Sequence, residues 1–402
     1  MIKVEKIIPG GQALGTDDSG KKIFFWNALP GEIVDSFRIT KNKSHYSEAI
    51  AETIQNPSSY RRQPKDVCFL STSPWQIIDY DYELKLKQSL IVEFFREQKI
   101  PIETPDIITD QRDYYYRNKM EYALYWDKET AKISLAFHMR GSHQKIPIQT
   151  SSIERPEIFQ AATKIDDELN QKRLEARNYQ SLLLRCNQSG EVSGGLYEKH
   201  QPHPVFPNLT DEIFNQTYSY SPNGFFQINL PVYKMALQTI KANIKTDKVL
   251  DYYSGVGTIG LSTASDKELT LVEVDRFAFD ELCRNIQSLN QNDQNSIKPH
   301  LYEYQSKNIR AIFDKSENVL SYIEPDATII LDPPRAGCDE NLITKLSEIK
   351  PETIIYLSCN PATQARDVKK LLNQYKIKTI QTYNFFPHTP HIENLVILEK
   401  SC

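Results

Sequence analysis

The pattern of hydrophobic and polar positions changes character along the chain and predicts three units. In the first 56 residues, short β-rich runs such as Lys22-Ile-Phe-Phe-Trp26 alternate with turn signals such as Pro9-Gly-Gly11. A helical pattern follows at 82–98, and beyond Ser221 strand-like runs alternate with helix-like ones. We predict an N-terminal β barrel (1–56), a central α+β region (57–220) and an α/β domain with a doubly wound, mostly parallel sheet (221–402).

The predicted strands of the third unit end at turns rich in glycine, proline and polar residues. Ligands bind at the carboxyl ends of strands in sheets of this kind. The strands predicted here cover 248–252, 269–274, 327–331 and 352–357, and the helices cover 230–244, 276–289 and 362–372. The turns that follow these strands are therefore the first places to look for chemistry.

Composition narrows the class of protein. The chain has 402 residues, of which 40% are hydrophobic and 25% charged, as in soluble globular proteins. It shows no apolar run long enough to span a membrane and no signal-peptide core, so a cytoplasmic protein without membrane contact is predicted. The six cysteines are scattered without a Cys-x-x-Cys pair, which disfavours disulfides and a metal site. The net charge of −4 leaves room for local basic clusters that bind nucleic acid.

One thiol, Cys359, stands at the end of a predicted buried strand. The run 352–357 stops at Ser358-Cys-Asn-Pro361, and a helix is predicted to follow. A helix N-terminus can lower the pKa of a thiol toward the reactive thiolate. A small structural cysteine is the alternative.

A glycine turn follows the first strand of the α/β unit. Gly255-Val-Gly-Thr-Ile-Gly260 fits a dinucleotide fingerprint, and Glu273 at the next strand end can accept hydrogen bonds from ribose hydroxyls. Both NAD and S-adenosylmethionine carry such a ribose. Asp251 favours S-adenosylmethionine, because a carboxylate attracts its cationic end and would repel a pyrophosphate.

Two further acids complete a possible reaction site. Asp332 begins the stiff turn Asp332-Pro-Pro-Arg335, for which a purely structural turn is the alternative. Glu393 opens the last predicted strand, for which a solvated strand end is the alternative. A thiol and a carboxylate are what methylation of an unactivated pyrimidine carbon needs. A thiolate that attacks C6 of uracil makes C5 nucleophilic, and a base must then remove the C5 proton.

The first two units carry features found in RNA-binding proteins. Small five-stranded barrels often bind single-stranded nucleic acid. The stretch 113–121 places three tyrosines beside Arg117 and Lys119, which can stack on bases and pair with phosphates. A strand with aromatic packing is the alternative.

The motifs together resemble the RNA 5-methyluridine (uracil-C5) methyltransferases. The resemblance is nearly chain-long and includes an N-terminal TRAM barrel, here with Leu29-Pro-Gly-Glu32. The matching motifs are Tyr116-Arg-Asn-Lys119, Phe225-Phe-Gln-Ile-Asn229, Asp251-Tyr-Tyr-Ser-Gly-Val-Gly-Thr258, Asp332-Pro-Pro-Arg-Ala-Gly337, Ser358-Cys-Asn-Pro-Ala-Thr363 and Pro390-His-Ile-Glu393. It implies a Rossmann-like methyltransferase domain that methylates C5 of a uridine in tRNA or rRNA through a covalent Cys–C6 adduct.

Carried onto this chain, the resemblance implies a role for each matching residue. Cys359 would be the nucleophile and Glu393 the base. S-adenosylmethionine would be contacted by Gln227, Tyr253, Thr258, Glu273, Asn308 and Asp332, and RNA by Tyr116, Arg117, Lys119 and Phe226. A monomer is predicted.

Two departures from the family pattern are visible. Many members bind a four-iron cluster through four cysteines, but 63–88 holds only Cys68, so no iron–sulfur cluster is expected. Thr258 replaces an Asn seen in some members. An NAD-linked oxidoreductase and a non-catalytic RNA-binding protein are the rival hypotheses, and the choice between tRNA and rRNA stays open.

Overall fold

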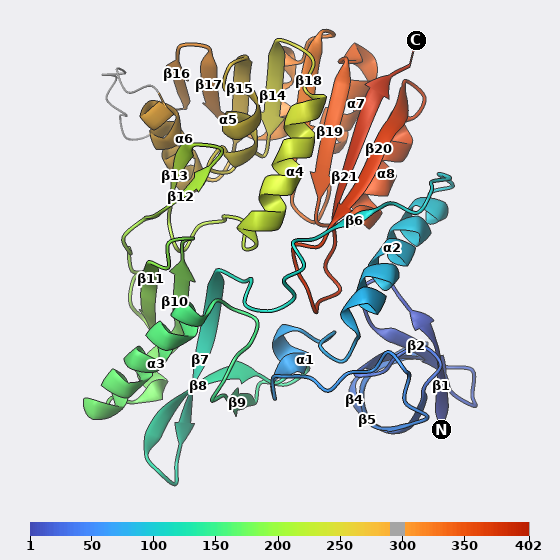
Figure 1. Cartoon of the computed structure of the whole chain (residues 1–402), viewed down its shortest axis with the longest axis vertical. Helices are drawn as coiled ribbons and strands as arrows, with labels where there is room; N and C mark the ends of the chain where they lie inside the picture. The colour runs from blue at the N-terminus through green and yellow to red at the C-terminus, as the bar shows by residue number, and fades with distance from the viewer. Residues whose placement is uncertain (290–301, 402) are drawn as a thin grey trace.

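The computed structural model describes residues 1–289 and 302–401. Three bodies are visible: a small barrel, a small sheet with one helix against it, and a large sheet covered by helices (Figure 1). The parallel strands of the large sheet point their carboxyl ends toward the two smaller bodies (Figure 1). Within the described ranges, no helix is both long and apolar enough to cross a membrane.

The barrel confirms the five-stranded N-terminal unit. Its strands close in the order β1-β2-β3-β5-β4. Alternate residues such as Val4, Phe25 and Val34 fill the interior, as the two-residue period of a strand requires. The strands are β1 (Ile2–Ile7), β2 (Ala13–Thr16), β3 (Lys22–Trp26), β4 (Ile33–Asn42) and β5 (Tyr46–Gln55).

The central body is a five-stranded sheet in the order β11-β10-β7-β8-β9, with helix α3 (Pro156–Gln171) packed on it. All its strand pairs are antiparallel. Its core is a separate apolar cluster that contains Tyr122, Ile158 and Leu182. The strands are β7 (Lys119–Asp127), β8 (Lys132–His138), β9 (Lys145–Pro147), β10 (Tyr179–Cys186) and β11 (Val192–Glu198), and a 3₁₀ turn, η1, covers Ala176–Asn178.

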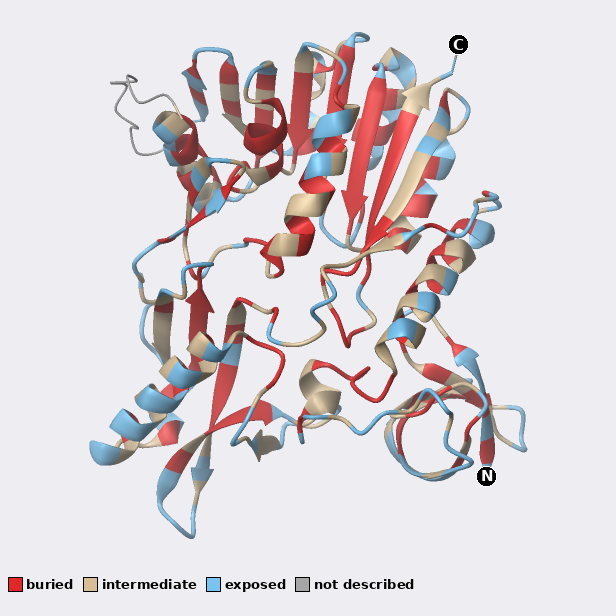
Figure 2. Cartoon of the chain, in the orientation of Figure 1, coloured by how far each residue is buried: buried red, intermediate tan, exposed pale blue. Residues whose placement is uncertain are grey.

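The large sheet has the order β16-β17-β15-β14-β18-β19-β21-β20-β6 in the described part of the chain. Its central pairs are parallel, and β21 runs antiparallel between β19 and β20. The strands are β14 (Lys248–Tyr252), β15 (Glu268–Glu273), β16 (Glu303–Ser306), β17 (Ile309–Phe313), β18 (Ala327–Leu331), β19 (Thr353–Ser358), β20 (Tyr375–Tyr383) and β21 (Glu393–Lys400). Every residue of β18 and β19 is buried, as expected for strands covered on both faces (Figure 2).

Helices cover both faces of this sheet and confirm the doubly wound fold (Figure 1). They are α4 (Leu230–Asn243), α5 (Thr258–Ala264), α6 (Arg276–Leu289), α7 (Glu340–Ile349) and α8 (Pro361–Leu371), with 3₁₀ turns η2 (Ser316–Asn318) and η3 (Leu320–Tyr322). The helices α4 and α6 begin at the predicted residue and α8 begins one residue earlier, whereas α5 and α7 were not predicted.

Both ends of the stretch predicted as the central unit, 57–220, pack against the large sheet or its helices. Helix α2 (Tyr80–Glu97) packs against α8, and β6 (Ile107–Ile108) joins the large sheet beside β20, so both belong to the α/β body. The hairpin of β12 (Leu209–Ile213) and β13 (Gln216–Tyr220) packs on α6. The short helix α1 (Phe69–Thr72) precedes α2 and contacts β8. The apolar faces of α2 and the hairpin decide this, because each is buried against the larger core.

Candidate active site

Cys359 and Glu393 are brought together at the carboxyl edge of the large sheet. Cys359 follows β19 directly, and Glu393 is the first residue of β21. These strands are antiparallel neighbours, with Ser358 paired to Asn394. One step further along this register, Cys359 lies opposite Glu393, and opposite residues of an antiparallel pair point to the same face.

The electrostatics of the thiol differ from the prediction. Burial and the negative charges of Glu393 and Asp332 raise the pKa of Cys359 to about 11, against the opposing charge of Arg335. The expectation of a lowered pKa at the helix N-terminus is therefore wrong for the unliganded site. A helix terminus carries only a partial charge, which does not offset two carboxylates and burial.

The two carboxyl groups are held in a poorly solvated place. Burial, reinforced by the charge of Asp332, raises the pKa of Glu393 well above its usual range. Burial raises the pKa of Asp332 itself to about 7. Because Glu393 and Asp332 both raise the pKa of Cys359 and Asp332 also raises that of Glu393, the three groups form one electrostatic cluster.

The glycine turn after β14 is shaped by packing. Gly257 has φ +88°, and a Cβ there would lie 2.5 Å from a methyl carbon of Leu282. The buried Asp251 accepts a hydrogen bond from the Gly260 N–H at 2.8 Å through one oxygen. Asp251 thus holds the turn through this hydrogen bond. Because Asp251 is buried, the structure does not support the prediction that it faces the cationic end of a ligand.

Glu273 closes this turn from the neighbouring strand. Its carboxylate accepts hydrogen bonds from the N–H groups of Gly255 at 2.7 Å, Val274 at 2.8 Å and Asp275 at 2.6 Å. Burial nevertheless raises the pKa of Glu273. These three hydrogen bonds hold the Glu273 carboxylate, a hydrogen-bond acceptor, in one position beside Gly255. There is space at Gly255, because no described atom lies within 4 Å of the place that a Cβ would take there.

Tyr253 and Thr258 flank the same turn. The Tyr253 hydroxyl accepts hydrogen bonds from Ser316 Oγ at 2.9 Å and from the Asp339 N–H at 3.3 Å. Thr258 opens α5, and its hydroxyl lies 2.8 Å from that of Tyr233. Tyr253 also lines a cavity of about 540 Å³ that extends past Asp339. The structure thus groups Tyr253, Thr258 and Glu273 around one turn.

Gln227 lies in the segment that leads into α4. The residue is buried, and Asn118 Nδ2 donates to its backbone carbonyl at 2.9 Å. Phe226, predicted to contact RNA, is also buried, with its ring stacked on Tyr220 at 3.8 Å between centroids. Phe226 therefore has no free face for a base. Phe225 is 72% exposed and is the aromatic that the sequence reasoning missed.

Tyr116 and Lys119 also contact protein. Tyr116 is buried and its hydroxyl donates to the Pro387 carbonyl at 3.0 Å, so its predicted stacking on RNA is wrong. Lys119 Nζ donates to the carbonyls of Asn223 at 3.0 Å and Gly224 at 3.2 Å, and burial lowers its pKa to about 8. Only Arg117 keeps its charge directed toward the site, where it helps to lower the pKa of His391.

Asn308 lies at the wrong edge of the sheet for a cofactor contact. It sits in the turn between β16 and β17, and its carbonyl accepts from the Leu269 N–H near the start of β15. Its side-chain amide donates to the carbonyls of Ser265 and Lys267. Because β17 runs parallel to β15, this turn lies at the amino edge, whereas Glu273 lies at the carboxyl edge. The predicted role of Asn308 is therefore wrong.

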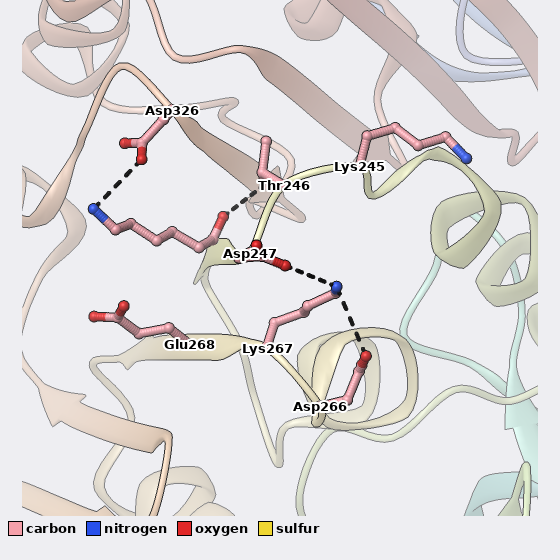
Figure 3. Close-up of a pocket in the computed structure, with 8 residues that line it drawn as sticks. Lys245, Thr246, Asp247, Asp266, Lys267, Glu268 and Asp326 are labelled. Atoms are coloured by element: carbon pink, nitrogen blue, oxygen red, sulfur yellow. Dashed lines mark hydrogen bonds and ion pairs between the residues drawn. The ribbon is translucent and has the colours of Figure 1, made fainter.

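The same amino edge carries a cavity of about 590 Å³ (Figure 3). Two of its lysines are paired with neighbouring acids, Lys267 with Asp247 at 3.1 Å and Lys248 with Asp326 at 3.5 Å. Such solvated, mutually paired charges are typical of a protein surface. The cavity lies away from the cluster of Cys359.

Cys68 lies in the central body and is buried. Among the residues that the structure describes, no group of three or more His, Cys, Asp or Glu side chains is placed to hold a metal ion. The expected lack of an iron–sulfur cluster stays a prediction.

Known proteins resemble this chain over most of its length. A family model described as tRNA (uracil-5-)-methyltransferase matches residues 208–401. A protein of Nanoarchaeum equitans described as an RNA methyltransferase is 30% identical, with 95% of this chain and 90% of that protein aligned. Another, from Lactobacillus johnsonii, is 27% identical over 95% of this chain and 94% of its own.

A solved structure shares the whole fold. The tRNA (uracil-54, C5)-methyltransferase of Pyrococcus abyssi, in complex with S-adenosyl-L-homocysteine, superposes with a TM-score of 0.75 at 22% identity. The match covers 99% of this chain and 100% of the other. The barrel, the central body and the large sheet are therefore arranged in this chain as in a known protein.

Proposed function

We propose that this chain, which belongs to the RNA methyltransferases, methylates C5 of one uridine in a structured RNA through Cys359 and Glu393. The family is one of RNA-modifying enzymes, which sets aside the NAD-linked oxidoreductase and the non-catalytic RNA-binding protein. The observation that supports the proposal is the register of β19 and β21, whose last pair, Ser358 with Asn394, adjoins both Cys359 and Glu393.

The reaction needs a thiol that adds and later leaves. The Cys359 sulfur forms a bond to C6, and the electron pair of the C5=C6 bond becomes available at C5. After C5 has accepted a methyl group, Glu393 takes the C5 proton, the double bond re-forms and the sulfur–C6 bond breaks. No oxidant or reductant is consumed. The pKa values of both groups are raised in the unliganded site, which favours their protonated forms, whereas the reaction uses the thiolate and the carboxylate.

S-adenosylmethionine fits the residues around the glycine turn. Glu273 offers a fixed acceptor for ribose hydroxyls, and the space beside Gly255 admits a ligand close to the backbone. Tyr253, Thr258, Gln227 and Asp332 would complete the contacts. When bound, this cofactor supplies the methyl group and a positive charge, and a positive charge near Asp332 lowers the pKa values of the neighbouring thiol and carboxyls.

Positive side chains around His391 support an RNA substrate. Desolvation by the surrounding protein, helped by the charges of Arg335, Lys87, Arg117 and Arg140, lowers the pKa of His391 to about 4, although part of the residue is exposed to solvent. Lys87 is fully buried and paired with Glu83, so the cations that remain for RNA are Arg335 of the large sheet and Arg117 and Arg140 of the central body. The phosphates of a flipped-out nucleotide would need such cations beside the site. The family description favours tRNA as the first RNA to test, with rRNA as the alternative.

Two variants test the proposal. Cys359→Ala should bind S-adenosylhomocysteine like the wild type and transfer no methyl group to tRNA transcripts. Glu393→Gln should accumulate a denaturant-stable protein–RNA adduct, because the C5 proton is no longer removed. Methylation by Cys359→Ala, measured as tritium incorporated from labelled cofactor, would contradict the mechanism. The substrate is identified by which RNA, tRNA or rRNA, loses 5-methyluridine in cells without this protein.

A further inference from the structure

The segment 384–392 connects β20 to β21 and ends directly at Glu393. It descends from the edge of the large sheet into the space between the three bodies (Figure 1). The backbone of this segment is held by groups from outside the sheet. The Pro387 carbonyl accepts from Tyr116 of the central body, and the Phe385 carbonyl accepts from Asn229 at 3.2 Å.

Helix α2 supplies a buried ion pair to the same segment. Glu83 and Lys87 are both fully buried and lie 2.7 Å apart. Lys87 Nζ donates to Asn384 Oδ1 at 2.6 Å and to the Phe386 carbonyl at 3.0 Å. The Glu83 carboxylate accepts the His388 N–H at 2.9 Å and 3.1 Å, one distance to each oxygen. His388 has φ +57°, a left-handed conformation that a histidine rarely adopts without such support.

The N-terminal barrel reaches the segment as well. Trp75 links them, because its backbone N–H donates to the His388 carbonyl and its indole Nε1 donates to the Gly11 carbonyl, both at 3.0 Å. Gly11 packs directly on Pro390: a Cβ on Gly11 would lie 2.2 Å from Pro390 Cβ and 2.6 Å from its Cγ. Barrel, α2 and large sheet share one continuous apolar core. The barrel therefore lies against the segment three residues before Glu393.

We propose that the N-terminal barrel is a positioning part of the active site. Through Gly11, and together with Trp75 and the Glu83–Lys87 pair of α2, it holds segment 384–392 so that Glu393 stays beside Cys359. The inference rests on the proposed role of Glu393 as the base. It differs from the general expectation for such a barrel, which is to hold RNA: the barrel acts on the reaction step as well as on binding.

Two neighbouring glycines allow a matched test. Gly10 and Gly11 both have positive φ, +94° and +89°, so an alanine strains the backbone equally at each. The Gly10 Cβ would meet no described atom within 4 Å, whereas the Gly11 Cβ would collide with Pro390. Gly11→Ala should therefore displace segment 384–392 through a steric clash with Pro390. Gly10→Ala is the control for backbone strain and for any loss of barrel stability.

The assay separates binding from reaction. Steady-state kinetics on tRNA transcripts give kcat and KM, and denaturing gels give the fraction of enzyme in covalent adduct. Gly11→Ala should lower kcat by about tenfold to a hundredfold, since a displacement of about 1 Å can cost a hundredfold. Its adduct should accumulate, while KM for RNA and the thermal shift by S-adenosylhomocysteine stay unchanged. Gly10→Ala should match the wild type.

Other outcomes are equally informative. A rise in KM with unchanged kcat would mean that the barrel only binds RNA, and equal behaviour of the two alanine variants would also overturn the inference. If Glu393→Gln forms no adduct, the proposed function itself fails; if it does while Gly11→Ala does not, only this inference fails.

Two more variants guard against a misfolded Gly11→Ala. Pro390→Gly removes the atoms that the new Cβ would hit, so Gly11→Ala should cost less kcat in that background than in the wild type. Trp75→Phe keeps an aromatic ring and removes the donor to Gly11. It should lower kcat with accumulated adduct, and an unchanged kcat for this variant would overturn the inference even where Gly11→Ala does not fold.

Discussion

Alkylation of Cys359 tests the electrostatics of the site directly. Burial and two carboxylates raise the pKa of this thiol from 9.0 to about 11. Two pKa units correspond to about 2.7 kcal/mol of preference for the protonated form. At about pH 8 an ordinary thiol of pKa near 9 is about one-tenth ionised, whereas Cys359 should be about one-thousandth ionised. Because only the thiolate reacts, iodoacetamide should modify Cys359 roughly a hundred times more slowly than an ordinary thiol.

The measurement is the rate of alkylation of the peptide that contains Cys359, followed by mass spectrometry. The rate should rise about tenfold per pH unit between about pH 7 and pH 9.5 and reach no plateau. Asp332 has a pKa of about 7, so it is ionised at the upper end of this range and disfavours the thiolate. Asp332→Asn should therefore raise the rate there. A plateau below about pH 9, or a slower reaction in Asp332→Asn, would refute the reasoning.

Three further predictions follow from burial and position. Lys87→Met leaves the Glu83 carboxylate buried without its cation and should lower the free energy of unfolding, measured by urea denaturation, by about 3–5 kcal/mol. Adding Glu83→Gln to this variant should restore much of the loss. A loss below about 1 kcal/mol in Lys87→Met would contradict the reasoning. If a base stacks on the exposed Phe225 ring, Phe225→Ala should raise KM for RNA about 5- to 150-fold. Phe225→Tyr keeps an aromatic ring and is the control. An unchanged KM in Phe225→Ala would contradict the prediction. Asn308→Ala should bind S-adenosylhomocysteine with unchanged affinity in calorimetry, and a clear weakening would return Asn308 to the cofactor site.

The sequence identified the strand ends because periodicity and turn residues act over short distances. The run 352–357, followed by Ser-Cys-Asn-Pro, predicts a strand, a turn and a helix, and the structure has β19 at Thr353–Ser358 and α8 at Pro361–Leu371. Asn308 was misplaced because β16 and β17 form a hairpin, and an antiparallel turn returns the chain to the amino edge. Strand direction depends on pairing, and local pattern does not report it.

The amino-acid sequence by itself determined the barrel, the alternating α/β unit and the residue types of the reaction, because each depends on neighbours a few positions away. Only the tertiary structure decided that Tyr116 and Lys119 hold protein segments, that the Cys359 thiol is protonated, and that α2 and Gly11 contact the segment before Glu393. Burial and charge at these positions come from residues up to about three hundred places apart in the chain, as between Glu83 and His388, and such proximity exists only once the chain has folded.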